Sequence, residues 1–134
     1  MNPKDIIDDL TRRFFDVFTT DADGKVNLDV IHDLFIPQGL IVKNVGPNPE
    51  IYNLQQFIEP RARMFEEGRL VDFVEEELSE RTEIFGNIAQ RFCRYRKSGT
   101  INGTPFETEG MKTIQFINTE NGWKMSALAW DDEA

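Results

Sequence analysis

Cysteine and histidine are nearly absent from this sequence, which contains only Cys93 and His32. A single cysteine cannot form a disulfide within the chain, and zinc sites are built from several cysteine, histidine or acidic ligands. We therefore expect neither a disulfide framework nor a zinc centre. Nothing else in the sequence indicates a metal or a bound cofactor, and we expect none.

Basic residues are also scarce, because 15 lysines and arginines stand against 24 aspartates and glutamates. The formal net charge is −9 and the pI is about 4.6. A protein this acidic is repelled by the phosphates of nucleic acids and by anionic lipid headgroups. We expect neither nucleic acid nor a membrane as a partner.

Long hydrophobic runs are missing as well. The N-terminal segment, MNPKDIIDDLTRRFFDVF, carries charges throughout and has no apolar stretch of the kind found in signal peptides. No stretch approaches the roughly 20 apolar residues of a membrane-spanning helix. These features predict a cytoplasmic protein.

The sequence does contain enough apolar material for one core, since 40% of its 134 residues are hydrophobic and eleven are phenylalanine. This length is close to the commonest domain size. No internal repeat, low-complexity stretch or long linker divides the chain. We therefore expect a single domain over residues 1–134.

The first half of the chain has helical periodicity in three places. Apolar residues at helical spacing predict helices over about 3–19, from Leu28 to before Pro37, and over about 54–67. Asn53 and Gln56 form the pattern of a capping box at the start of the third helix, and Pro60 predicts a kink or restart within it. Between the second and third helices, residues 39–44 and 51–52 read as a small hairpin.

From Leu70 onward the apolar pattern changes to a period of two, which predicts strands over about 70–80, 83–97, 105–118 and 122–131. Asn102-Gly103 and Asn121-Gly122 predict type I′ hairpin turns between the later strands. Three helices followed by a long meander indicate an α+β protein with a curved antiparallel sheet and helices packed on one face.

Three stretches carry a resemblance to a known family: Phe85-Gly86-Asn87-Ile88-Ala89-Gln90, the segment from Ser98 through Gly103 to Phe106, and Asn121-Gly122-Trp123-Lys124-Met125 through Trp130. With this order of elements, the chain resembles the nuclear transport factor 2-like superfamily, which includes SnoaL-like cyclases and ketosteroid isomerase. The resemblance implies a cone-shaped, cystatin-like fold, with the helices on the concave face, a small-molecule pocket between them and a homodimer. It leaves the function open, because one fold hosts many activities.

The chain departs from the ketosteroid isomerase pattern at each functional position. That mechanism needs an aspartate base and a tyrosine with a protonated aspartate as oxyanion donors. Where the resemblance places the base, the sequence has Asn44, and a neutral amide cannot abstract a proton. Phe14 and Phe15 stand in place of the tyrosine, and Lys112-Thr113-Ile114 in place of the second aspartate. We expect no steroid isomerase activity.

Clustered charges on the predicted strands have a structural and a functional interpretation. Strand alternation places Glu75 and Glu77 on one face and Glu76 and Glu80 on the other. It also separates Arg94 and Arg96 from the face of Arg91, Cys93 and Tyr95, so no single basic face forms. We favour ion pairs across the strands over a catalytic or metal-binding role, although one of the glutamates is in reach of a pocket.

A loop beginning at Thr19 is similar to part of an EF-hand, with Gly24 at the sharp turn. The first and twelfth positions of such a loop supply calcium ligands, and here they are Thr19 and Val30. We interpret the segment as a turn between helices. Cys93 is expected to be a buried apolar residue, and helical phase places His32 away from the core.

Three functions remain open. The first is a SnoaL-like protein that binds a small hydrophobic ligand in an apolar pocket, for which the resemblance implies Asn44, Tyr52, Thr113 and Trp130 as lining candidates. The second is an isomerase, cyclase, dehydratase or hydrolase that acts on a polycyclic or aromatic metabolite through a glutamate or aspartate, with no catalytic residue assigned. The third is a non-catalytic dimerisation module whose pocket is filled by its own phenylalanines. The long strands carry apolar residues on both faces, which predicts a homodimer through the convex face of the sheet.

Overall fold

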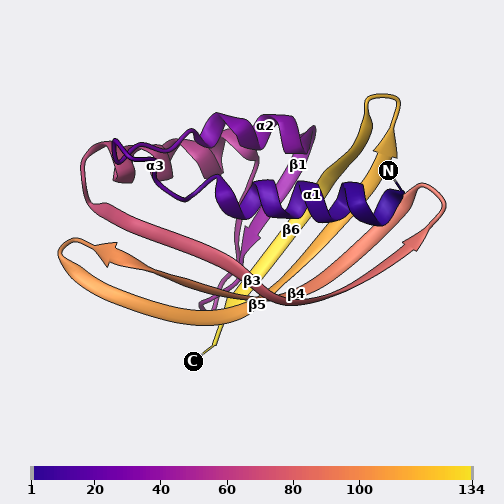
Figure 1. Cartoon of the computed structure of the whole chain (residues 1–134). Helices are drawn as coiled ribbons and strands as arrows, with labels where there is room; N and C mark the ends of the chain where they lie inside the picture. Colours follow the sequence, from indigo (N-terminus) through magenta and orange to yellow (C-terminus); the bar gives the residue numbers. More distant parts are fainter. Residues whose placement is uncertain (1, 134) are drawn as a thin grey trace.

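The computed structural model describes residues 2–133 as a layer of helices on one six-stranded sheet (Figure 1). The strand order is β2-β1-β6-β5-β4-β3. In chain order the elements are α1 (Pro3–Asp16), the 3₁₀ helix η1 (Leu28–Val30), α2 (Ile31–Leu34), β1 (Phe35–Lys43), β2 (Glu50–Tyr52), α3 (Leu54–Glu66), β3 (Leu70–Phe85), β4 (Ile88–Ile101), β5 (Thr104–Thr119) and β6 (Gly122–Asp132).

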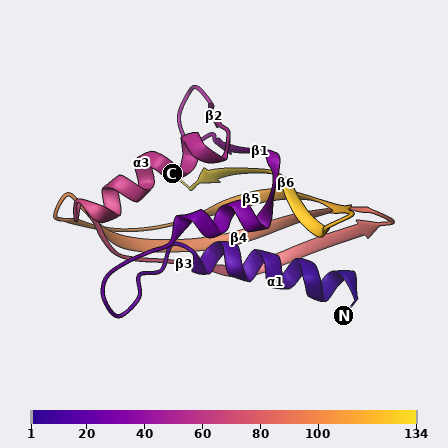
Figure 2. The same cartoon turned by 90° about the horizontal axis from the view of Figure 1, so that it is seen from above.

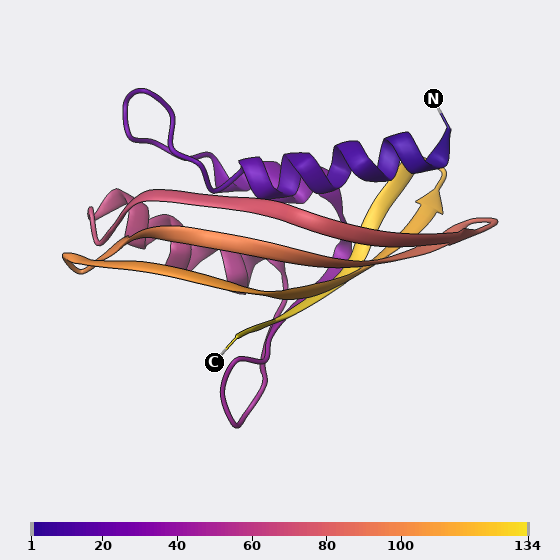
Figure 3. The same cartoon turned by 60° about the horizontal axis from the view of Figure 1, so that its bottom comes forward.

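The α+β class and the curved sheet are as predicted. All three α-helices lie over the concave face of the sheet, with α1 along the β3 side and α3 toward one end (Figures 1 and 2). Within residues 2–133 no helix crosses the opposite face of the long strands (Figure 3). None of the helices within residues 2–133 is long and apolar enough to cross a membrane.

Side-chain caps define where the two longer helices begin. The Asn2 side chain accepts a hydrogen bond from the Asp5 backbone N–H at 2.9 Å. At α3 the predicted capping box is confirmed: the Asn53 side chain accepts from the Gln56 backbone N–H at 2.8 Å, and the Gln56 side chain accepts from the Asn53 backbone N–H at 2.9 Å. The helix runs through Pro60 without a restart, because its buried residues Leu54, Phe57 and Ile58 hold it against the sheet.

The predicted antiparallel meander from Leu70 to Trp130 is confirmed, since β3 to β6 pair antiparallel in sequence order. Asn102 and Gly103 both have positive φ, 49° and 82°, as a type I′ turn requires. The type I′ prediction for Asn121-Gly122 is wrong. There only Gly122 has positive φ, because Thr119 pairs directly with Gly122 and the loop residues are Glu120 and Asn121.

Two further features of the sheet differ from prediction. It is mixed, because β1 joins it parallel to β6, with Ile41 opposite Leu128. The strand break expected near residues 81–82 is also wrong, since β3 continues to Phe85 and the chain turns at Gly86, where φ is 54°. A positive φ at glycine is inexpensive, so the turn forms there and not within the polar residues before it.

Irregular pairing in β3 changes which side chains share a face. The register with β4 shifts between Val71 and Val74 and again between Glu77 and Ser79. A bulge adds one residue to a strand and reverses the alternation after it. Glu80 therefore lies with Glu77 on the concave face, and the prediction that Glu80 shares a face with Glu76 is wrong.

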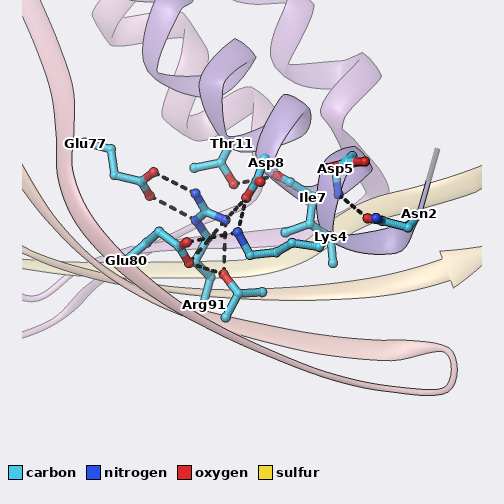
Figure 4. Close-up of polar contacts among 10 residues, drawn as sticks. Asn2, Lys4, Asp5, Ile7, Asp8, Thr11, Glu77, Glu80 and Arg91 are labelled. Carbon is cyan, nitrogen blue, oxygen red and sulfur yellow. Dashed lines mark hydrogen bonds and ion pairs between the residues drawn. The ribbon is translucent and has the colours of Figure 1, made fainter.

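An ion network around Arg91 of β4 ties α1 to the concave face of the sheet (Figure 4). The Arg91 guanidinium, only 4% exposed, donates to Glu77 at 2.6 and 3.0 Å and to Asp8 of α1 at 2.6 Å. Lys4 of α1 contacts both Asp8, at 2.7 Å, and Glu80, at 2.9 Å. The Lys4–Glu80 and Arg91–Asp8 contacts join residues that are 76 and 83 positions apart in sequence.

The expected ion pairing across strands is therefore confirmed, with different partners in one case. Arg91 pairs with Glu77, and Arg96 pairs with Glu76 on the opposite face. Arg94 instead turns to β5, where its Nε lies 3.0 Å from Glu109. The glutamate run is thus neutralised largely within the sheet.

The network shifts the pKa of several of its members. Burial by itself lowers the pKa of Arg91, but hydrogen bonds to Glu77 and Asp8 outweigh it and the pKa is raised. For Asp8 burial acts to raise the pKa, and the hydrogen bonds from Lys4 and Arg91 win, so the pKa lies below its ordinary 3.8. The pKa of Glu80 is lowered from 4.5. The hydrogen bond from Thr82 has the largest effect, burial acts in the opposite direction, and the hydrogen bond from Lys4 lowers the pKa further.

These directions predict acid sensitivity. Asp8 and Glu80 have lower pKa values folded than unfolded, so below about pH 4.5 the unfolded chain takes up more protons and the free energy of unfolding falls. Asp8→Asn is expected to be less stable than wild type at pH 7 and to lose less stability on acidification. Urea unfolding between pH 7 and pH 3 measures both effects.

Asp16→Asn, at the exposed end of the same helix, is the matched control and should follow the wild-type pH profile. If the free energy of unfolding fell equally with pH in the wild type and in Asp8→Asn, protonation of Asp8 would not contribute to the acid sensitivity.

Candidate functional site

A cavity of about 650 Å³ opens between α3, the end of α1 and the concave face of the sheet. This volume is within the roughly 300–1,000 Å³ typical of small-molecule sites. Aromatic side chains from both helices and from four strands form much of its wall: Phe14, Phe18, Tyr52, Phe57, Phe65, Phe73, Phe106 and Trp130.

The four residues considered as lining candidates are divided by the structure. Tyr52 and Trp130 are on the cavity wall. Asn44 is exposed in the segment after β1, where its backbone N–H donates to the Trp130 carbonyl at 3.0 Å. Thr113 is exposed on the convex face, because its neighbours Lys112 and Ile114 point inward and are buried. Neither Asn44 nor Thr113 lines the cavity.

Trp130 connects the strands to α3. Its indole is 9% exposed and meets the Phe57 ring edge to face, with centroids 6.1 Å apart. The indole Nε1 is buried and finds no hydrogen-bond partner among residues 2–133. An unpaired buried donor of this kind costs about 1–3 kcal/mol, which marks Trp130 as more than a space-filling residue.

A buried ion pair lies on the sheet side of the cavity. Lys112 Nζ is 3.0 Å from Glu75 Oε2, and the two side chains are only 4% and 5% exposed. The ammonium also lies 4.2 Å from the centre of the Tyr95 ring and 5.1 Å from that of Trp130. Bulge geometry in β3 and ordinary alternation in β5 bring the pair together on the concave face.

A second, less buried pair closes the end of the cavity near the C-terminus. Lys97 Nζ is 3.0 Å from Asp132 Oδ1. The Tyr95 hydroxyl donates to the same carboxylate and contacts the Asp131 carbonyl at 3.1 Å. Burial and the Asp132 carboxylate both raise the pKa of Tyr95, so its phenol stays protonated. Opposite it, Gly110 is required, because a Cβ there would collide with the Tyr95 ring.

Arg61 reaches the cavity from α3. Its guanidinium carbon lies 3.9 Å from the centre of the Phe57 ring, 5.3 Å from that of Tyr52 and 5.9 Å from that of Trp130. Desolvation lowers the pKa of Arg61, against smaller opposing effects of Tyr52 and Glu50. Within residues 2–133 no carboxylate lies within 4.0 Å of this guanidinium.

Sequence reasoning missed Arg61 and Lys112 as cavity residues. The spacing of four between Phe57 and Arg61 placed them on one face of the predicted helix and was the signal available. For Lys112 the one signal was the resemblance, which puts an oxyanion donor at Lys112-Thr113-Ile114, because a lysine on a strand is normally at the surface.

Cys93 and His32 are outside this site. Cys93 is completely buried, and burial, followed by the nearby Glu77 charge, raises the pKa of its thiol to about 12. Such a thiol is not a nucleophile at neutral pH. His32 is exposed on α2, as its helical phase predicted. No group of three or more histidine, cysteine or acidic side chains among the described residues has the arrangement of a metal site.

Comparison with solved structures finds the same architecture in other proteins. An NTF2-like protein from Cytophaga hutchinsonii has a TM-score of 0.75 at 11% identity, over 99% of this chain and all of that one. An NTF2-like superfamily protein from Salmonella enterica reaches 0.76 at 15% identity, over 98% and 91% of the two chains. A cystatin-like protein from Caulobacter vibrioides reaches 0.73 at 16% identity, over 98% and 89%. No protein-family model and no curated protein sequence matches this chain.

The buried Lys112–Glu75 pair yields a prediction about stability. Lys112→Met leaves the Glu75 carboxylate buried without a partner, which is expected to lower the free energy of unfolding by about 3–5 kcal/mol. Replacing both residues, Lys112→Met with Glu75→Met, is expected to recover most of this loss. Urea denaturation of the two variants and of wild type gives the three values.

Lys97→Met is the comparison variant, because its pair with Asp132 is more exposed; we expect a loss of about 1 kcal/mol. A Lys112→Met protein as stable as wild type would mean that water reaches Glu75 freely.

Proposed function

We propose that this protein, whose fold is that of the nuclear transport factor 2-like superfamily, binds a small and largely apolar molecule in the cavity beneath α3. The observation that carries this proposal is the cavity of about 650 Å³, whose wall is rich in aromatic side chains and also carries charged ones, of which Glu75 and Lys112 are buried. Ligand sites in proteins combine these same two features: apolar walls supply affinity, and a few polar groups set orientation.

The open volume favours a ligand over a pocket that the chain fills itself. Phe14, Phe18 and Phe57 are packed against each other or against neighbouring rings at the wall, with centroids 5.4–6.1 Å apart. Their rings are thus engaged with the core and leave the cavity free. A dimerisation module without a ligand would gain stability by closing such a space, because empty volume costs packing energy.

An enzyme is the second candidate, and Glu75 is the observation that favours it. Its carboxylate is on the cavity wall and almost completely buried, which is the setting in which acidic residues act as acids or bases. Lys112 occupies one oxygen of this carboxylate at 3.0 Å. For Glu75 to act as an acid or base, a substrate would first have to separate it from the Lys112 ammonium or interact with that ammonium. Binding of a ligand does not require this step.

Filling the cavity tests the binding function. Thr108 lines the cavity from β5, and Thr108→Phe should place a ring in the space. We expect the variant to bind the neutral fluorescent probe N-phenyl-1-naphthylamine at least about tenfold more weakly than wild type, a loss of about 1.4 kcal/mol. Fluorescence titration measures both dissociation constants.

Thr104→Phe, on the same strand but exposed and not among the residues that line the cavity, is the matched control and should bind like wild type. Absence of probe binding to the wild-type protein, or equal binding by Thr108→Phe, would contradict the proposal.

We also propose that two copies associate through the convex face of the sheet. This face has no helix over it (Figure 3), and strand register places four exposed apolar side chains there: Leu40, Phe85, Ile88 and Phe92. Exposed apolar side chains on an uncovered sheet face are a feature of surfaces that bind another protein. Two arginines on the same face, Arg94 and Arg96, already have carboxylate partners, whereas Arg81 opposite Phe92 has none within 4.0 Å among residues 2–133 and would have to stay at the rim.

A charge at the centre of this face should separate the copies. Phe92→Glu is expected to elute as a monomer of about the chain mass of 15.5 kDa, while wild type has twice that mass by light scattering at micromolar concentration. Phe92→Leu keeps the surface apolar and should remain dimeric. A wild-type mass equal to that of one chain would refute the dimer.

A further inference from the structure

We infer that the ligand of this cavity carries a carboxylate on an aromatic or alicyclic body, and that Arg61 binds that carboxylate. This inference rests on the proposed binding function and adds the chemical class of the ligand. It follows from the charges on the cavity wall and from the position of the Arg61 guanidinium.

Every carboxylate on the cavity wall already has a cationic partner. Glu75 is paired with Lys112 and Asp132 with Lys97, each at 3.0 Å, and Glu133 is paired with Arg94. These pairs use both lysines that the central strands β4 and β5 contribute to the wall, Lys97 and Lys112. Among residues 2–133 they leave no unpaired carboxylate on the cavity wall to repel an anion.

Two wall cations have no such partner. Arg61 from α3 and Lys43 from β1 both line the cavity, and neither has a carboxylate within 4.0 Å among residues 2–133. The exposed Glu50, which is the register partner of Lys43 on β2, acts on Arg61 only through its charge, and its Oε1 accepts a 2.6 Å hydrogen bond from the Tyr52 hydroxyl. In a protein with a net charge of −9, a cavity with unpaired positive charge selects for an anionic ligand.

Arg61 has hydrogen-bond donors to spare. A guanidinium carries five N–H groups; Arg61 donates from Nη1 to the Phe57 carbonyl at 3.1 Å and also interacts with the Tyr52 hydroxyl, and these two contacts leave further N–H groups for a ligand. Its plane is held against the Phe57 ring, with Tyr52 and Trp130 nearby. A guanidinium positioned in this way is preorganised for the two parallel hydrogen bonds of a carboxylate.

The remainder of the wall defines the body of the ligand. Rings of Phe57, Tyr52 and Trp130 surround the guanidinium, and further phenylalanines continue the surface into the cavity. A flat apolar body stacks on such rings. The single guanidinium, with Lys43 as the other wall cation without an ion pair, matches the single negative charge of a carboxylate better than the higher charge of a phosphate ester. We therefore assign a monocarboxylate and not a phosphate.

The experiment compares three probes that share one ring system: 2-naphthoate, 2-naphthalenemethanol and 2-naphthyl phosphate. Trp130 in the cavity wall reports binding through its fluorescence, in a Trp123→Phe background that leaves it as the single tryptophan. We expect naphthoate to bind about 10- to 100-fold more tightly than the neutral alcohol, as a charged hydrogen-bonded contact provides, and more tightly than the phosphate.

Arg61→Gln in the same background is expected to remove the preference for naphthoate and to leave the affinity for the alcohol within about twofold. Arg63→Gln is the matched control, because Arg63 is exposed on the same helix and pairs with Glu59. It should retain the preference. Arg61→Lys keeps the charge but loses the planar fork of donors, so it should lose part of the preference for naphthoate. This variant tests the contact if Arg61→Gln proves less stable than wild type in urea.

The outcomes separate the inference from the proposed function. Equal binding of naphthoate and the alcohol, or an unchanged preference in Arg61→Gln and Arg61→Lys, overturns the carboxylate assignment while cavity binding stands. Tighter binding of the phosphate overturns the choice of carboxylate. Binding of none of the probes to the Trp123→Phe protein overturns the inference together with the proposed function.

Discussion

Three short helices have to cover the concave face of a sheet with much longer strands, and the rest of the structure depends on this constraint. A strand of 16 residues such as β3 extends about 53 Å, whereas the 14 residues of α1 extend about 21 Å. The helices therefore meet the sheet only over its middle and one end. Where α3 bridges the bent strands, the facing surfaces do not close, and the cavity is the space that remains.

Charges inside this incomplete layer are arranged in pairs. Burying an ion without a partner costs several kcal/mol, so the deeply buried cations Arg91 and Lys112 each have carboxylates within 3.0 Å. The Arg91 network holds the first turns of α1 against β3 and β4, and the Lys112 pair stabilises the cavity wall. Arg61 is the exception to this rule, since it contacts aromatic rings and a backbone carbonyl but no carboxylate of the described chain.

The chemical character of the site follows from what is buried around it. Cys93 and Tyr95 are held in their protonated, neutral forms by desolvation, and Glu75 is engaged by Lys112. The wall is therefore better equipped to hold a ligand than to transfer protons to it. Recognition by aromatic stacking together with one oriented guanidinium requires no group that changes its protonation state near neutral pH.

The sequence by itself determined the order of helices and long strands, the first I′ turn and the face on which Arg91, Cys93 and Tyr95 lie, because these depend on periodicity and on local turn chemistry. It also placed Tyr52 and Trp130 near a pocket through the family resemblance. Only the tertiary structure decided that β1 lies parallel to β6, that a bulge puts Glu80 with Glu77, and that Thr113 faces outward while Lys112 faces the cavity. A one-residue shift in register exchanges the two faces of a strand, and the meeting of Arg61 with Trp130 joins segments almost seventy residues apart. Such contacts are set by how the elements pack against one another, which no local pattern in the chain specifies.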